Sequence, residues 1–124
     1  MGSTARVSGK TLDAVDELTK AQRRVVRELL GEAHEAELGA ALTDVEAALS
    51  EWRSGKILPS DVNERVHEYH KEAQQIFKTY NYLDPMLALS RAVVFGYINL
   101  EQVPEVLRPR VTELQSLVRA DGGV

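Results

Sequence analysis

Two of the chain's three histidines lie three positions apart in a glutamate-rich segment, NERVHEYHKEAQ, which covers residues 63–74. Imidazole and carboxylate groups are common ligands of zinc and iron in proteins. Glu64 and His67 also form the Glu-x-x-His pair that carboxylate-bridged di-iron bundles place on two of their helices. The segment therefore makes Glu64, His67 and His70 candidate ligands for a metal ion.

Helical phasing separates these three side chains. The apolar residues around them recur at steps of 4, 3, 4, 3 and 4, which predicts a helix with one buried stripe. At about 100° per residue, His70 lies at the edge of that stripe, whereas Glu64 and His67 point towards solvent. A di-iron site also needs a second Glu-x-x-His pair, but the sequence contains only the pair formed by Glu64 and His67. Metal or small-molecule binding is therefore the alternative hypothesis. The stripe consists of Val62, Val66, Tyr69, Ala73, Ile76 and Tyr80.

No residue pattern argues for catalysis. The chain has no cysteine and therefore no thiolate nucleophile, and it has no Gly-x-Ser-x-Gly elbow. Phosphate-binding loops and dinucleotide fingerprints are also missing from the sequence. The sequence thus predicts no cofactor and gives no argument for an enzyme.

The charge balance makes nucleic acid an unlikely partner. Fifteen basic and nineteen acidic residues leave a net charge of −4, which repels polyanions at long range. The local exception is a set of basic residues that would form a strip on one helix. No apolar run is long enough to predict a membrane segment, and the absence of cysteine fits a reducing, cytoplasmic location. The basic set is Lys20, Arg23, Arg24 and Arg27.

Helical periodicity throughout predicts an all-α fold, a small antiparallel bundle of four main helices. Start signals are a capping box at Thr19 with Gln22, Ser60 followed by Asp61, and Asp84 followed by proline. We expect disorder at residues 1–10 and 121–124, with residues 11–120 forming a single domain. The expected helices are 20–53, 61–80, 85–96 and about 109–119, with short helices at 12–18 and 100–107.

A helical hairpin is expected at the centre of this bundle. A second apolar stripe precedes the first one and has steps of 4, 3, 4 and 3. Two such stripes joined by a short loop predict that residues 38–53 pack antiparallel against residues 61–80. The second stripe is Leu38, Leu42, Val45, Leu49 and Trp52.

The apolar stripe changes direction within the long segment 20–53. Val26, Leu30 and their apolar neighbours centre on a direction about 150° from that of the later stripe. Gly31 and Gly39 bracket this change. Either the helix breaks there and folds over the C-terminal helices, or it stays continuous and its first half packs on another subunit through Val26 and Leu30.

Aromatic residues gather around the end of the third long segment. They fit either a core with hydroxyls at its rim or a groove where a partner docks on tyrosines. The second interpretation makes Tyr69, Phe77, Tyr80 and Tyr82, with His70 beside them, candidate interaction residues. Phe95 and Tyr97 belong to the same aromatic set.

The spacing W-R-S-G-K-I…H-E-Y-H…F-K-T-Y resembles small bacterial helical proteins of unknown function over roughly half of the chain. This resemblance implies no activity, ligand or residue role. The leading hypothesis is therefore a non-catalytic helical protein that acts through protein–protein interaction, as an adaptor, an antitoxin-like inhibitor or a regulatory subunit. Self-association as a homodimer is part of this hypothesis.

Overall fold

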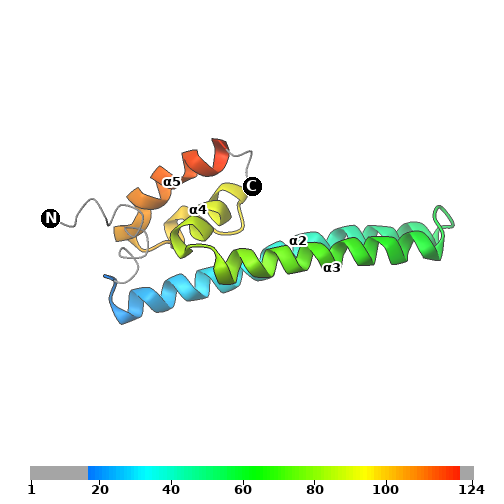
Figure 1. Ribbon diagram of the computed structural model, residues 1–124, viewed down its shortest axis with the longest axis horizontal. Coiled ribbons are helices and arrows are strands. Elements are labelled where there is room, and N and C mark those ends of the chain that lie inside the picture. The colour runs from blue at the N-terminus through cyan, green and yellow to red at the C-terminus, as the bar shows by residue number, and fades with distance from the viewer. Residues whose placement is uncertain (1–16, 121–124) are drawn as a thin grey trace.

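The computed structural model describes residues 17–120, and every regular element in this part of the chain is helical (Figure 1). The predicted all-α class with four main helices is confirmed. The predictions for residues 1–10 and 121–124, and most of the short helix expected at 12–18, fall outside the described residues. The α-helices are α2 (Lys20–Arg53), α3 (Pro59–Tyr82), α4 (Pro85–Phe95) and α5 (Arg108–Ala120), and the 3-10 helices η2 (Leu100–Gln102) and η3 (Glu105–Leu107) lie between α4 and α5.

Helix α2 is uninterrupted. It begins at the predicted capping box, in which the amide of Gln22 donates to Thr19 Oγ1 at 3.1 Å and the amide of Thr19 donates to Gln22 Oε1 at 3.0 Å. The helix continues through Gly31 and Gly39 to Arg53. Of the two alternatives that the stripe leaves open, the continuous helix is the one observed.

A tight turn joins α2 to α3. Gly55 adopts φ +83°, in the left-handed region that glycine enters without strain, and the amide of Lys56 donates to the carbonyl of Glu51 at 2.8 Å. Pro59 then opens α3 at its first position, and the amide of Leu58 donates to Asp61 Oδ2 at 2.9 Å. The helix therefore starts slightly before the predicted Ser60.

Helices α4, η2, η3 and α5 pack on one end of the hairpin. We call this region the base; it consists of these helices together with residues 20–37 of α2 and 76–82 of α3. Helix α4 lies between α2 and α5, as its nearly all-round apolar sequence predicts (Figure 1). It ends at Gly96, whose φ of +79° is again left-handed. No helix in the described part of the chain is long and apolar enough to cross a membrane. The core consists of Leu18, Val26, Leu29, Ala33, Met86, Leu89, Ala92, Ile98, Val103, Leu107 and Val111.

The rest of the hairpin, residues 38–75, projects away from the base, and we call it the arm. Figure 1 shows α2 and α3 running side by side along the arm, with α4 and α5 confined to the other end. The predicted bundle is therefore limited to the base. Among the described residues, the arm consists of two helices and the turn between them.

The change of stripe direction within α2 now has a structural explanation. In the base, Val26, Leu29 and Ala33 point into the core formed with α4 and α5. In the arm, Ala41 and Ala48 are the buried residues. One continuous helix thus serves two different partners, and both belong to its own chain.

Candidate functional site

Small side chains form the interior of the arm. Ala41 and Ala48 of α2 are only 6% and 4% exposed, while Val62, Tyr69 and Ala73 of α3 are half-buried. Because the alanine side chain is small, two helices that meet at alanines can bring their axes close together. The arm therefore encloses little apolar volume of its own.

Two of the three leucines of the predicted stripe lie outside this interior. Leu42 is 46% exposed and Leu49 is 41% exposed. Each of them follows a buried alanine by one residue, a rotation of about 100° around the helix. The hairpin is thus confirmed, but its seam on α2 is centred one residue earlier than predicted.

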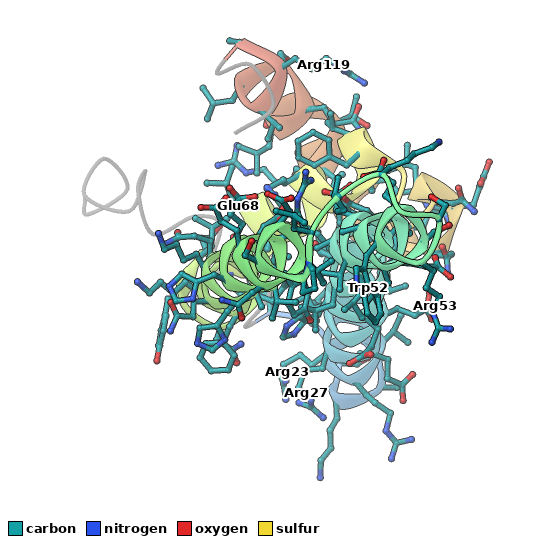
Figure 2. All side chains as sticks on the ribbon, turned by 90° about the vertical axis from the view of Figure 1, so that its right-hand side faces the viewer. Arg23, Arg27, Trp52, Arg53, Glu68 and Arg119 are labelled. Carbon is teal, nitrogen blue, oxygen red and sulfur yellow. The ribbon has the colours of Figure 1, made fainter. Side chains whose placement is uncertain are left out.

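Helix α3 repeats this arrangement on the same side of the hairpin. His70 and Phe77 follow the more buried Tyr69 and Ile76 by one residue. Because α2 and α3 are antiparallel, a one-residue rotation from the seam leads to the same side on both helices. Figure 2, which views the molecule from the tip of the arm, places Trp52 on the side away from α4 and α5.

We call this surface the apolar face. It has open depressions along both helices, one beside Leu42 and Leu49 and one beside Phe77. The described part of the chain places no other helix over it (Figure 2). Its exposed members are Leu42, Leu49 and Trp52 from α2 and Val66 from α3, together with Phe77 where α3 enters the base, and Leu38, Val45 and Ala73 are half-buried between them.

The opposite side of the arm is acidic. Near the tip, Glu51, Asp61, Glu64 and Glu68 line a depression together with one arginine, Arg65. Arg65 Nε lies 3.7 Å from Glu68 Oε1, and Glu68 lies on the side of α4 and α5 in Figure 2. The arm is therefore a two-helix element with one charged side and one apolar side.

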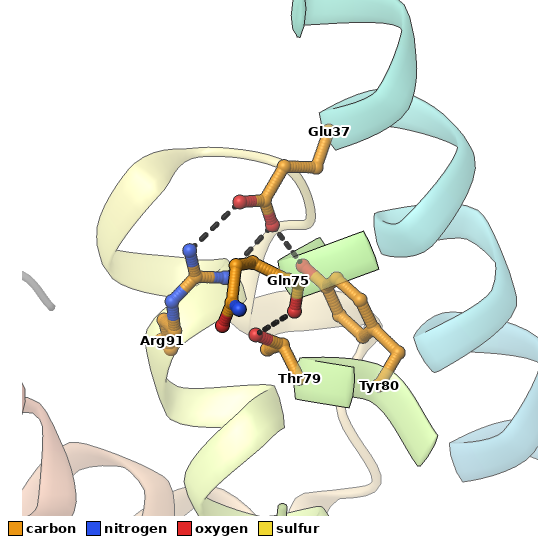
Figure 3. A network of polar contacts seen from close by, with 5 residues as sticks. All are labelled: Glu37, Gln75, Thr79, Tyr80 and Arg91. Carbon is orange, nitrogen blue, oxygen red and sulfur yellow. Dashed lines mark hydrogen bonds and ion pairs between the residues drawn. The ribbon is translucent and has the colours of Figure 1, made fainter. Parts of the chain in front are cut away.

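A partly buried polar junction joins α2, α3 and α4 in the base, next to the arm (Figure 3). Glu37 of α2 accepts two hydrogen bonds from Arg91 of α4, from Nη1 at 2.8 Å and from Nη2 at 2.7 Å. The Tyr80 hydroxyl of α3 donates to the same carboxylate at 2.8 Å, and the His34 ring stacks on the Tyr80 ring with centroids 5.3 Å apart. Three helices thus meet at one carboxylate.

The surroundings of Glu37 favour its charged form. Burial by itself raises the pKa of Glu37, but hydrogen bonds from Arg91 and Tyr80 and the positive charge of Arg91 outweigh burial, so the pKa lies below its ordinary value. Burial and the bond to Glu37 raise the pKa of the Tyr80 hydroxyl, and the same carboxylate raises the pKa of Arg91. The junction is therefore a fixed ion pair at neutral pH.

Both oxygens of the Glu37 carboxylate are already engaged, because Oε1 accepts from Arg91 and Tyr80 and Oε2 accepts from Arg91. An effective general base has a pKa near the operating pH, whereas the pKa of Glu37 lies below its ordinary value. The arrangement instead joins α2, α3 and α4 rigidly. We regard it as the element that positions the arm and its apolar face.

The predicted interaction residues separate into exposed and internal groups. Tyr82 is 76% exposed, and the Phe77 and Tyr82 rings form an edge-to-face pair with centroids 6.1 Å apart. Tyr69 is half-buried, and the Tyr80 hydroxyl is taken up by the junction. His70, Phe77 and Tyr82 line an open depression of ≈ 320 Å³. Val26 is only 2% exposed, and Leu30 packs against the base core.

The predicted metal ligands are all exposed on α3, but they do not converge. Glu64 lines the acidic depression, whereas His70 lines the depression beside Phe77. Within residues 17–120, no three histidine, aspartate or glutamate side chains come together in a group able to hold a metal ion. Metal binding by His67 and His70 stays a prediction without a third ligand.

The predicted basic strip lies on the first turns of α2. Lys20, Arg24 and Arg27 are exposed, and Arg23 Nη1 donates to the carbonyl of Leu18 at 2.8 Å. In Figure 2, Arg23 and Arg27 lie on the same side of the hairpin as Trp52. The strip therefore borders the base end of the apolar face.

Sequence reasoning missed Glu37 and Arg91. They lie 54 positions apart, so no local pattern connects them. Each nevertheless has a signal of its own. Arg91 is the one charged residue in the apolar segment PMLALSRAVVFGYI, and Glu37 follows buried Ala33 by four positions. A charged side chain placed among buried positions requires a partner.

No known protein family, curated protein or solved structure matches this chain, so its function has to be inferred from its own geometry.

Proposed function

We propose that this chain acts by binding another polypeptide through the apolar face of its arm. The observation that carries the proposal is the exposure of Leu42, Leu49 and Trp52 along one side of a two-helix arm whose most buried residues are alanines. A fold that only needed to be stable would turn the larger side chains inwards, because burial stabilises in proportion to apolar area. Their outward position supports contact with a partner.

The composition of the face also favours a protein partner. Contiguous exposed apolar surface on a folded chain marks interaction sites, whereas single exposed leucines carry no such meaning. Tryptophan is among the side chains that most often dominate binding energy when a partner covers it, and Trp52 lies on the face. The junction at Glu37 holds α2, α3 and α4 rigidly, so the chain loses little conformational entropy when a partner binds.

A lipid surface fits the arm less well than a protein does. Interfacial helices carry lysine and arginine along the borders of their apolar side. Here the borders of the apolar side are mixed, with Glu46 beside Leu42 and Leu49 on α2 and Lys78 beside Phe77 on α3, and the chain as a whole has a net charge of −4. Carboxylates at the border of the face repel anionic headgroups.

Within this proposal the chain is a non-catalytic adaptor, an antitoxin-like inhibitor or a regulatory subunit. The three roles share one physical requirement, a rigid surface that recognises a protein without reacting with it. We place this activity in the cytoplasm, in keeping with a chain that contains no cysteine.

Site-specific photo-crosslinking in the cells that naturally contain the chain tests the proposal. A benzophenone amino acid at position 49 reports on the apolar face, and the same group at position 117 reports on α5, where Leu117 is also exposed. We expect discrete covalent protein adducts from position 49 and none from position 117. Equal adducts from both positions, or none from position 49, contradict the proposal.

Vesicle flotation distinguishes the lipid alternative. The purified chain is mixed with vesicles of neutral lipid and with vesicles containing anionic lipid, and we expect it to stay with the protein fraction in both cases. Flotation that is lost in Leu49→Ser and kept in Leu117→Ser would assign the apolar face to membranes and overturn the proposal.

A further inference from the structure

We infer that the polypeptide bound by the apolar face is a second copy of this chain, so that two arms pack face to face. This inference rests on the proposed function and adds the identity of the partner to it. Three features of the face carry it: its size, the charges along its two edges, and the height at which those charges lie.

The face has the size of a dimer interface. From His34 to Arg53, α2 rises about 30 Å, and two helices side by side are about 20 Å wide. The resulting plan area of about 600 Å² is close to the roughly 800 Å² per partner of a standard stable interface. A single bound helix would cover only about half of that width, whereas a second hairpin would cover all of it.

Apart from Arg53 at the tip of α2, whose guanidinium lies 5.8 Å from the centroid of the Trp52 ring, the two edges of the face carry opposite charges. On α2, Glu46 lines the depression beside Leu42 and Leu49, and Glu35 precedes Leu42 by two helical turns. On α3, Lys78 lines the depression beside Phe77, and Lys71 precedes it by two turns. None of these four charges forms an ion pair within the described chain.

The charges on the two edges lie at matching heights. His34 stacks on Tyr80 and meets Phe77 edge-on, so Glu35 and Lys78 are at the same height along the hairpin. The same number of residues, counted towards the tip from Glu35 on α2 and from Lys78 on α3, leads to Glu46 and to His67. Glu46 therefore lies at the height of His67 and within about one turn of Lys71. Glu35 thus has Lys78 at its own height on the other edge, and Glu46 has Lys71 within about one turn of its height.

These edges favour one arrangement of the two copies. A two-fold axis along the hairpin sets α2 of each copy against α3 of its partner, so Glu35 meets Lys78 at the same height and Glu46 comes within about one turn of Lys71. A two-fold axis across the hairpin sets the acidic edge of α2 against itself. The charge pattern is thus self-complementary in the first arrangement, which is what an isologous interface requires. The product is a four-helix arm with both bases at one end.

Light scattering coupled to size-exclusion chromatography gives the first test. At about 100 µM we expect the wild-type chain to elute with twice its mass of 13.8 kDa. Leu49→Ser should weaken association at least about 30-fold, and Leu117→Ser should leave it unchanged. Circular dichroism confirms that both variants are folded. A wild-type monomer, or a Leu49→Ser variant that still dimerises, overturns the inference.

Charge exchange tests the arrangement. Glu35→Lys with Glu46→Lys forms one variant, and Lys71→Glu with Lys78→Glu forms the other. Each alone should associate at least about 10-fold more weakly than the wild-type chain, and a one-to-one mixture should regain dimers. If the mixture shows no recovery, the two edges do not meet and the lengthwise axis is wrong.

Failure of the inference and failure of the proposed function give different results. If the wild-type chain stays monomeric but position 49 still yields adducts to a different polypeptide, the dimer inference is wrong and the binding function stands. If position 49 yields no adduct, the binding function itself is lost.

Discussion

The base and the arm bury their apolar residues in opposite ways. In the base, large side chains such as Met86, Leu89 and Val111 are completely enclosed by α2, α4 and α5. In the arm, alanines are enclosed and leucines are left outside. The base therefore has a core that is covered on all sides, whereas the arm leaves one apolar side uncovered. This contrast teaches that the apolar content of a helix does not by itself say whether its partner lies in the same chain.

The largest expected effect comes from making the same substitution in both regions. Leu89→Ala removes a fully buried side chain from the base and should lower the free energy of unfolding by about 4 kcal/mol. Leu49→Ala removes a side chain that is already partly in water, and its cost should be about 1 kcal/mol or less. Urea unfolding at a protein concentration where light scattering gives a single chain measures both. Equal losses would show that the arm has a core of its own.

The second prediction concerns the polar junction at Glu37, which joins α2, α3 and α4 in the base next to the arm. Glu37→Gln leaves the partly buried Arg91 guanidinium without its charged partner and should lower the free energy of unfolding by about 3 kcal/mol. Glu28→Gln, at an exposed position of the same helix, should change it by less than about 0.5 kcal/mol. Urea denaturation of the two variants gives the comparison. Similar values for both would mean that the ion pair contributes nothing to holding α2 and α4 together.

The same ion pair predicts an acid dependence. Because the pKa of Glu37 is lowered in the folded state, its contribution is complete above the unfolded-state pKa of about 4.3 and is lost as pH falls through the lower folded value. The difference in unfolding free energy between wild type and Glu37→Gln should therefore shrink as the pH falls below about 4. Urea midpoints measured across this range check it, and a difference that stays constant contradicts it.

The extent of each helix could be predicted from the sequence because its signals are local. The capping box at Thr19, the proline before Met86 and the glycine at position 96 act within a few residues. The seam of the arm could not be found in this way. Periodicity weighs large apolar residues such as Leu42 more heavily than alanines, whereas close helix packing selects the smallest side chains.

The candidate site was accessible to sequence reasoning only in part. The aromatic pattern led to His70, Phe77 and Tyr82, which do lie on one open depression. The junction was not accessible, because the pairing of Glu37 with Arg91 depends on how α4 packs on α2. Helical phasing of the sequence had already separated Glu64 from His70, and the two side chains do line different depressions of the arm.

A smaller effect should separate the inside of the arm from its outside. Ala48→Leu adds bulk where α2 and α3 meet and should lower the free energy of unfolding by about 2 kcal/mol. Ala47→Leu adds the same atoms at an exposed position and should change it by less than about 0.5 kcal/mol. Thermal or urea unfolding measures both variants. A tolerated Ala48→Leu would mean that the two helices of the arm are not closely packed.

The smallest expected effects come from the two glycines inside α2, one in the base and one in the arm. Both are exposed, and a Cβ added at either meets no atom within 4 Å, so Gly31→Ala and Gly39→Ala should each raise the free energy of unfolding by about 0.8 kcal/mol. Gly39 also lines the depression beside Leu42 and Leu49. If a second arm approaches closely there, Gly39→Ala weakens dimerisation while it stabilises the monomer, and Gly31→Ala only stabilises. Urea unfolding and light scattering on the two variants distinguish these effects, and a destabilised Gly39→Ala monomer would contradict the continuous helix on which both regions depend.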